Sequence, residues 1–453
     1  MRPASAPIVS SHAMAAEDAV LSVTESQVTG PSVTEPPVTE PPVTEPPGFG
    51  DHPGRQARLS EQMGTAWSAW RRPLAVAAVG TLVLRVVTEW IGLVSQFGVD
   101  FPHRVARTPY LLTQVWGHWD AGYYFSIAQD GYAGRHVGVG QAANGIAFAP
   151  LYPWGIKLVH AVTGRGYLSS GELLSAGALF VALAALFRLA ELERGAAVAG
   201  ASVLVLLAWP AAFFLLAPYP ESLALALGVL AFLAVRRGRW TMAGILVAAA
   251  AMTKYYLALY VVALAFAVWE ARPSGTALAA RWRPDAWRLF RAIGPTVGAF
   301  GAWMVYQQVH IGDALAFERA QSRQWHRNLA APWTLLSRTI SDLVHWRFLD
   351  TSKASVVELF DFVTVVLLAA VAVWVFLRVR RSYGVILALS WCVYCFQTFL
   401  IGEVREVLAL FPFFMALGMW VARHPWRERI LLALFLPCSY FLIERFVRGA
   451  FAG

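Results

Sequence analysis

The chain has 453 residues, of which 57% are hydrophobic and 14% charged. This balance excludes an ordinary soluble domain, which is about half apolar and about a quarter charged, and the mean hydropathy of +0.52 is typical of a membrane protein. The net charge of +9 does not indicate a nucleic-acid partner, because the basic residues cluster at the ends of apolar stretches, beside anionic lipid headgroups.

The first 65 residues are predicted to be a disordered, proline-rich cytoplasmic tail. The sequence Val-Thr-Glu-Pro-Pro begins at Val33 and recurs from Val38 and Val43. Proline at this density removes backbone donors and prevents helix formation, so we expect an extended, solvated segment. Such a tail is either dispensable or a proline-rich ligand for a partner domain. Residues 66–453 then form the membrane domain.

Apolar stretches predict an all-α integral membrane protein, a multi-span helical bundle with about eleven transmembrane helices. The first span is expected from about Leu74 to Ser95, and within it Arg85 and Glu89 are four apart and are predicted to pair. A long first extracytoplasmic loop, rich in polar and aromatic residues, extends from there to about Ser170. The other spans are expected near residues 172–190, 196–216, 221–235, 240–253, 255–269, 292–309, 356–377, 385–401, 407–422 and 430–446.

Arginine clusters between the apolar stretches predict the orientation, because cytoplasmic loops of membrane proteins are enriched in Lys and Arg. The clusters at 71–72, 236–239, 378–381 and 423–429, and the stretch 272–291, all fall on one side if the amino terminus is cytoplasmic. The extracytoplasmic side then receives the polar residues of the candidate motifs and their neighbours: Asp120, Asp130, Tyr219, Glu221, Lys254, Asp313, Glu318, Glu403 and Arg405. Any chemistry is therefore expected outside the cytoplasm.

The stretch from His118 to Tyr124 reads His-Trp-Asp-Ala-Gly-Tyr-Tyr and places the carboxylate of Asp120 among aromatic side chains in the first loop. A charge beside a membrane is costly and commonly functional, whereas Trp and Tyr suit the lipid–water interface. Two interpretations follow. The stretch is either a reaction site for a lipid-borne substrate or an interfacial anchor that contains an incidental Asp.

Five short motifs follow one another along residues 74–446. They are Trp119-Asp120 with Ile127-Ala128 and Gly131-Tyr132, Phe148-Ala149-Pro150-Leu151-Tyr152-Pro153, Tyr219-Pro220-Glu221-Ser222-Leu223, Gly312-Asp313-Ala314-Leu315-Ala316-Phe317 with Ala320-Gln321 and Trp325, and Arg405 with Phe411-Pro412. Their order resembles that of the GPI mannosyltransferase II-like family, which has many bacterial members and belongs to the integral-membrane glycosyltransferases of GT-C type. The chain departs from the family pattern at His118, Pro220 and Lys254.

The resemblance implies a mannosyltransferase that moves a mannosyl residue, with inversion, from a polyprenyl-phosphate-mannose donor to a lipid-linked or glycan acceptor on the extracytoplasmic side. No soluble nucleotide sugar is available there, so a lipid-phosphate sugar is the natural donor. The GT-C superfamily carries an Asp or Glu in the first external loop, which implies that Asp120 is the catalytic base for the acceptor hydroxyl. Asp130 is the competing base, or a turn residue before Gly131.

A phosphate leaving group needs cationic contacts, and three sets of basic residues are candidates for binding the donor phosphate. Arg319, Arg323 and Arg327 are four apart, so on a helix they form one stripe, either a phosphate site or a solvated face. Arg405 lies at an extracytoplasmic span end and either pairs with a glutamate two residues before it or binds phosphate. Lys254 is the third candidate, or a snorkelling anchor.

The candidate substrate contacts are polar or aromatic residues of these motifs and their neighbours: His118, Trp119, Tyr123, Tyr152, Tyr219, Glu221, Asp313 and Gln321. The histidines show no close metal-ligand spacing, so no metal or other cofactor is predicted, although a carboxylate-bound divalent ion stays open as an alternative. Cys392 and Cys395 form a C-x-x-C inside an apolar stretch and are interpreted as buried small residues rather than as a metal or redox site.

Two other functions compete with this interpretation. A related transferase would move another lipid-phosphate sugar, such as arabinose or glucose. A membrane lipid or solute transporter would place ionisable residues at the bilayer midplane and show a repeat across its halves. Here the polar groups gather in two long loops on one face, and no repeat is visible. The enzyme is therefore favoured, with a polyprenyl-phosphate sugar donor, a lipid or glycan acceptor and the bilayer as its partners.

Overall fold

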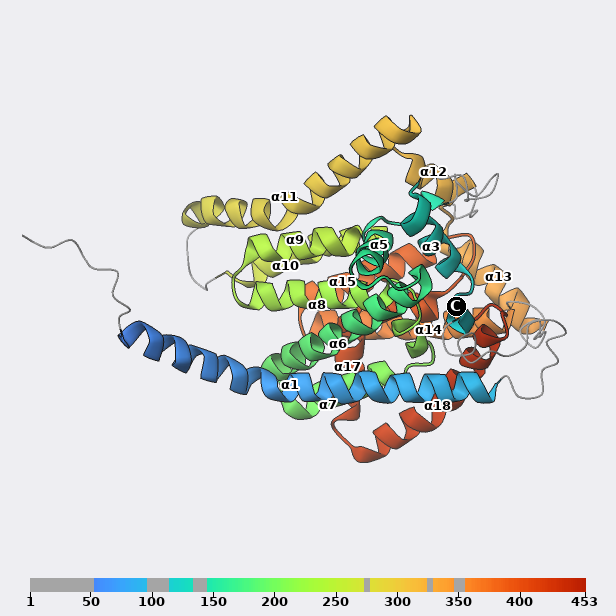
Figure 1. Cartoon of the computed structure of the whole chain (residues 1–453), viewed down its shortest axis with the longest axis horizontal. Coiled ribbons are helices and arrows are strands. Elements are labelled where there is room, and N and C mark those ends of the chain that lie inside the picture. Colours follow the sequence, from blue (N-terminus) through green and yellow to red (C-terminus); the bar gives the residue numbers. More distant parts are fainter. Residues whose placement is uncertain (1–52, 96–113, 133–144, 273–277, 324–328, 346–354) are drawn as a thin grey trace, which may run out of the picture. The chain divides into compact units, whose positions relative to one another are not determined.

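The computed structural model of the chain describes residues 53–95, 114–132, 145–272, 278–323, 329–345 and 355–453. In these segments the backbone is mainly helical, and the extended pairing is limited to an isolated bridge between Leu329 and Gln397. Residues 60–453 fold as one compact unit (Figure 1). The predicted all-α class is confirmed for the described residues.

Helix α1 (Pro53–Val94) begins within the segment that was predicted to be a tail. Residues 1–52, which hold the proline repeats, lie outside the described residues. The proline-rich composition ends at Pro53, and Pro is favourable at the first position of a helix. The residues after it include the good helix formers Arg, Gln, Ala and Leu. The domain boundary predicted at residue 65 therefore falls inside a helix.

Four helices among the described residues are long and apolar enough to cross a membrane. They are the part of α1 from Trp67 to Val94, α6 (Tyr167–Arg194), α14 (Ser355–Arg378) and α18 (Pro425–Val447). Helices of 23 to 28 residues are about 34–42 Å long, which exceeds the ~30 Å hydrocarbon core of a bilayer. The protein is therefore a multi-pass helical membrane protein. In α1, Arg85 and Glu89 pair at 2.8 Å, as their spacing predicted.

Most of the remaining predicted spans coincide with helices too short to cross a membrane alone. These are α7 (Ala196–Ala208), α8 (Glu221–Arg236), α9 (Trp240–Ala251), α10 (Tyr260–Glu270), α15 (Arg381–Cys395) and α17 (Phe411–Val421). The 12 residues of α9 extend about 18 Å. The sequence predicted longer spans because the turns after these short helices are apolar too, so an apolar stretch extends past the end of the helix. The turn η2 (Ala212–Leu215) after α7 is an example. The predicted span 292–309 lies within α11 (Leu278–Ile311).

Glycines allow several of these helices to pack closely. Helix α8 packs against α6 and α9, and α9 packs against α11 (Figure 1). Gly244 of α9 faces the backbone of α11, where an added Cβ would lie 2.5 Å from the carbonyl oxygen of Arg291. Gly418 of α17 faces Ser202 of α7 in the same manner. Small residues at such positions are typical of helix packing in membranes.

A sharp bend separates α16 (Glu403–Glu406) and the following turn η5 (Val407–Ala409) from α17. The two helical parts meet at 90°, and Pro412 in the first turn of α17 suits a helix start. Glu403 and Arg405 are buried although both carry charge. The bent segment is either a broken span, the fifth crossing helix, or a re-entrant loop. In both cases it brings a charged turn into the helix bundle, where protein rather than lipid surrounds it.

Candidate functional site

Helix α3 (Asp120–Asp130) carries the aspartate that the first-loop motif singled out. It follows the short turn η1 (Gln114–Trp116) and begins at Asp120, whose carboxylate is favourable in the first turn of a helix. Trp119, just before it, has a φ of 58°, the only positive φ of a non-glycine residue in the described segments. Such a backbone conformation is strained for Trp and persists where the surrounding structure enforces it, often at functional sites.

Five charged side chains from four parts of the chain meet where α3 begins, and we call them the charged cluster: Asp120, Glu221, Lys254, Arg405 and Glu406. Arg405 lies at its centre. Its Nη1 donates to Asp120 Oδ2 at 2.9 Å, and its Nε lies 3.3 Å from Glu221 Oε1. Its Nη2 lies 3.6 Å from Glu406 Oε1. Lys254 Nζ donates to Glu221 Oε1 at 2.9 Å and to Glu406 Oε2 at 2.6 Å.

The side chains of the charged cluster differ in how much of their surface is exposed to solvent. The side chain of Glu221, the first residue of α8, is 1% exposed, and that of Arg405 is 9% exposed. The side chain of Asp120 is 22% exposed and is the most accessible of the three carboxylates. Three carboxylates face two cations, a formal charge of −1. Charges interact strongly in such buried surroundings, so the charged cluster holds a strong local electric field.

Aromatic rings hold the guanidinium of Arg405 in place. Its Cζ lies 5.3 Å from the ring centroid of Phe214 and 5.2 Å from that of Tyr219, both within cation–π range. The hydroxyl of Tyr219 donates to the carbonyl oxygen of His118 at 2.8 Å. Burial raises the pKa of Tyr219 well above its usual range, so the phenol stays protonated and remains a donor. The ring of Tyr124 meets that of Tyr219 edge-on and extends this wall.

Tyr152 supports the site from behind. It is the second residue of α5 (Leu151–Thr163) and is fully buried. Its hydroxyl bonds with Ser175 Oγ at 2.8 Å, and Ser175 donates to the carbonyl oxygen of Tyr219 at 3.0 Å. The predicted substrate contact of Tyr152 would therefore have to act through Tyr219, because its own ring and hydroxyl are enclosed.

The residues that flank Asp120 in the chain are more open. Trp119 is half exposed, and its indole Nε1 donates to the carbonyl oxygen of Ala450 at 3.3 Å, which ties the strained residue to the carboxy-terminal segment. Tyr123 stacks on Phe148 with ring centroids 4.9 Å apart. Burial lowers the pKa of His118, so its imidazole is neutral at pH 7. His118 therefore does not add a third cation to the site.

The predicted contacts around Asp313 and Gln321 form a separate patch on α12 (Ala316–Arg323). Arg319 is exposed, and its Nη1 pairs with Asp313 Oδ2 at 2.8 Å rather than with the charged cluster. The side-chain amide of Gln321 donates to the carbonyl oxygen of Ala147 at 3.1 Å. The bond of Gln321 fixes α12 to the loop that precedes α5, and the pair of Asp313 with Arg319 joins α12 to the turn before it, so Asp313 and Gln321 act as structural contacts in this conformation.

The arginine stripe can be followed only in part. The side chain of Arg323 and the whole of Arg327 lie outside the described residues, while the helix predicted for the start of the stripe is present as α12. Helix α3 lies between the two patches. Its Tyr124 belongs to the main apolar core beside the charged cluster, whereas its Ile127 packs in a second apolar cluster with Ala320 of α12.

Two residues of the site escaped the sequence analysis, Glu406 and Asp361. Glu406 forms ion pairs with both Lys254 and Arg405. It belongs to no motif and adjoins Arg405 in the sequence, so nothing in the sequence set it apart. Asp361 gave a signal that could have been used, since an ionisable residue inside a predicted span indicates a role. Its Oδ2 accepts the N–H of Gly402 at 2.9 Å and its Oδ1 that of Val404 at 2.8 Å. Asp361 thereby anchors the start of α16, which carries Arg405.

Asp361→Ala should destabilise the protein, because two buried N–H groups lose their acceptor and each such loss costs about 1–3 kcal/mol. We expect a lower thermal unfolding midpoint of the detergent-solubilised protein, with a loss of any activity that needs Arg405 in place. Asp361→Asn keeps one accepting oxygen, so its unfolding midpoint should lie between those of the wild type and Asp361→Ala. An unchanged midpoint for Asp361→Ala would show that this carboxylate does not hold α16.

Among the described residues, no three His, Cys, Asp or Glu side chains are placed to hold a metal ion. The carboxylates of Asp120, Glu221 and Glu406 each pair with a cation instead. Cys392 and Cys395 have free thiols in α15. The site is therefore organised by ion pairs between side chains.

No protein-family model, curated protein or solved structure matches the chain. The functional interpretation therefore rests on the sequence motifs and on the geometry of the charged cluster.

Proposed function

We propose that the protein is an integral-membrane glycosyltransferase of GT-C type, related to the GPI mannosyltransferase II-like family. It transfers a mannosyl residue, with inversion, from polyprenyl-phosphate-mannose to a lipid-linked or glycan acceptor outside the cytoplasm. The observation that carries the proposal is the 2.9 Å ion pair of Asp120 with Arg405, which lie 285 positions apart and belong to the first and last of the five motifs. Glu221, from the third motif, joins the same cluster.

Asp120 is the residue best placed to act as the base, because it is the most accessible carboxylate of the charged cluster. In the proposed reaction the acceptor hydroxyl oxygen attacks the anomeric carbon of the mannosyl group, and its proton passes to Asp120. The bond from that carbon to the phosphate oxygen breaks, and the polyprenyl phosphate leaves with the electron pair. The leaving group is weakly basic and needs cations rather than a proton donor.

Arg405 and Lys254 supply those cations in the proposal, with Arg405 better suited to the planar geometry of phosphate. Both are paired with carboxylates before the donor binds, so the donor phosphate has to replace one of these partners. The pair of Arg405 with Asp120 is the one closest to solvent. Exchange at this pair would release Asp120 as an unpaired carboxylate, so donor binding would itself create the base.

We infer that the amino terminus is cytoplasmic, that the first loop and the charged cluster are extracytoplasmic, and that the chain crosses the membrane about eleven times, with the short helices lengthened by the turns that adjoin them. Helix α8 supports this orientation. It begins at Glu221 in the charged cluster and ends at Arg236 in one of the arginine clusters. The charged cluster and this arginine cluster thus lie at opposite ends of one helix. This agrees with the proposal that they lie on opposite sides of the membrane.

Cysteine labelling tests this orientation. In a variant whose native cysteines Cys392, Cys395 and Cys438 are changed to Ser, Arg165→Cys should react with a membrane-impermeant maleimide added to intact cells. Arg237→Cys should react only after permeabilisation. Both native arginines are exposed in the structure, so access to the reagent depends on the membrane alone. The reverse pattern would refute the proposed topology.

The function itself is tested with membranes that contain the protein, radiolabelled polyprenyl-phosphate-mannose and a lipid extract. We expect a labelled glycolipid or glycan that is absent with Asp120→Asn membranes. Parallel donors that carry glucose or arabinose decide which sugar is used, and added EDTA decides whether a divalent ion is needed. Movement of the labelled lipid across the bilayer without product formation would favour the transporter.

A further inference from the structure

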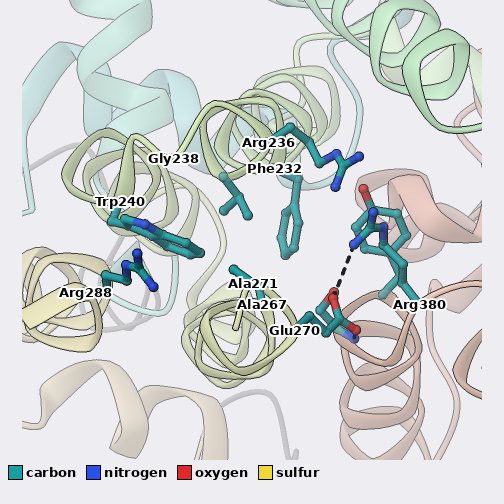
Figure 2. Close-up of a pocket in the computed structure, with 12 residues that line it drawn as sticks. Phe232, Arg236, Gly238, Trp240, Ala267, Glu270, Ala271, Arg288 and Arg380 are labelled. Atoms are coloured by element: carbon teal, nitrogen blue, oxygen red, sulfur yellow. Dashed lines mark hydrogen bonds and ion pairs between the residues drawn. The ribbon is translucent and has the colours of Figure 1, made fainter. Parts of the chain in front are cut away.

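The end of the bundle opposite the charged cluster holds a second concentration of charge. Helix α8 runs from Glu221 to Arg236, so about 22 Å of helix separates the two groups. Here the ends of α8, α10 and α15 surround a cavity of about 300 Å³. Phe232 and Trp240 form an apolar part of its lining, and Arg236 and Arg380 lie at its edge (Figure 2).

Two glutamates hold the arginines at this cavity in fixed positions. Glu193 lies 3.1 Å from Arg236 Nε and 3.0 Å from Arg380 Nε. Glu270 lies 3.6 Å from Arg380 Nη1 (Figure 2). It also accepts the backbone N–H of Ser382 at 2.9 Å. Arginines that are oriented in this way lose little further freedom when they bind a ligand.

Arginines outnumber glutamates in the groove beside this cavity. The groove has a volume of about 770 Å³. We call it the basic groove, and its charged residues are Arg194, Arg236, Arg378, Arg380, Arg381, Glu193 and Glu270. Five arginines against two glutamates leave a formal excess of three positive charges. Neither Arg378 nor Arg381 forms an ion pair with any described residue. The basic groove therefore attracts an anion.

Apolar side chains continue the basic groove along the sides of α10 and α14. Trp269, Phe376 and Leu377 line it and are exposed. The guanidinium of Arg381 lies over the ring of Trp269, 4.9 Å from its centroid. Tryptophan with arginine beside exposed apolar side chains is typical of the lipid–water interface. A ligand with an anionic head and an apolar tail would contact both parts, whereas a free phosphate would contact only the arginines.

We propose that the basic groove binds an anionic phospholipid, with its phosphate between Arg378 and Arg381 and its acyl chains along Phe376 and Leu377. Guanidinium groups match the geometry of phosphate oxygens, and basic pockets between transmembrane helices bind anionic lipid headgroups. This site lies apart from the charged cluster and does not depend on the proposed transferase activity.

The full chain, purified in a neutral detergent, tests the proposal with fluorescent phosphatidylglycerol as the probe. The double variant Arg378→Gln/Arg381→Gln should raise the Kd of the probe about thirtyfold, the effect expected for two headgroup contacts. Arg423→Gln/Arg429→Gln removes the same charge from exposed residues of another arginine cluster and should leave the Kd unchanged. All four side chains are exposed, so both variants should keep the wild-type thermal unfolding midpoint.

Competition identifies the source of the bound phosphate. Unlabelled phosphatidylglycerol should displace the probe, while phosphatidylcholine and inorganic phosphate at the same concentration should not. Displacement by inorganic phosphate alone would overturn the lipid assignment in favour of a free anion. Equal weakening in the two double variants would reveal a general effect of charge and would overturn the site.

Discussion

Asp120→Asn should lower the turnover number about a hundredfold or more, because Asn keeps the size of the side chain but cannot take the proton of the acceptor hydroxyl. The amide oxygen of Asn can still accept a hydrogen bond from Arg405, which also keeps Glu221 and Glu406 as partners. Folding and donor binding should therefore survive. Initial rates with radiolabelled donor give the turnover number, and the donor KM reports binding.

Asp130→Asn is the matched control for this change. Asp130 ends the same helix, α3, whose first residue is Asp120, and it is not a member of the charged cluster. Its variant should retain most of the turnover. Near-normal turnover of Asp120→Asn would end the proposed mechanism, whereas a loss confined to Asp130→Asn would move the base to the other end of α3.

Arg405→Ala should destabilise the fold by about 3–5 kcal/mol, the usual cost of breaking a buried ion pair on one side. The three carboxylates of the charged cluster would be left with Lys254 as their single cation. The ring contacts with Phe214 and Tyr219 would be lost as well. Turnover should also be abolished, because the leaving phosphate loses its guanidinium. Thermal unfolding in detergent and initial rates measure the two effects separately.

A second substitution separates the stability effect from the catalytic one. Arg405→Ala/Glu221→Gln removes one negative charge together with the positive charge, and Glu221 is the most buried carboxylate of the charged cluster. The double variant should regain part of the lost stability and none of the turnover. Regained turnover would make Arg405 a purely structural residue. If stability is not regained, the imbalance of charge is not what destabilises Arg405→Ala.

The members of the charged cluster were easier to predict than the pairs that they form. Asp120, Glu221, Lys254 and Arg405 could each be selected from the sequence, because each lies in or beside a motif and the arginine clusters place all four on the same expected side of the membrane. Which of them touch depends on four distant segments that meet in space. Sequence proximity suggested Glu403 as the partner of Arg405, while the structure joins Arg405 to Asp120.

Helix length was harder to predict than helix position. Hydropathy reports that a stretch is apolar, and it is insensitive to where the backbone turns. The 90° bend before Phe411 and the short turn after α7 both lie in apolar sequence. The burial of the Tyr152 side chain was equally hard to predict from the sequence. A motif with aromatic residues predicted a substrate contact there, but the burial of its ring depends on packing against Ser175 and Tyr219, which the motif does not encode.

Assembly in the membrane has to follow an order that the bend between α16 and α17 imposes. The turn Glu403–Glu406 carries three charged residues, and a charge at the centre of a membrane helix costs about 2.5–3.5 kcal/mol during insertion. The turn therefore cannot partition into lipid before its partners are in place. Asp120, Glu221 and Lys254 all precede it in the chain. During synthesis the earlier helices are expected to insert first and present these charges, so that docking of the turn becomes a late step.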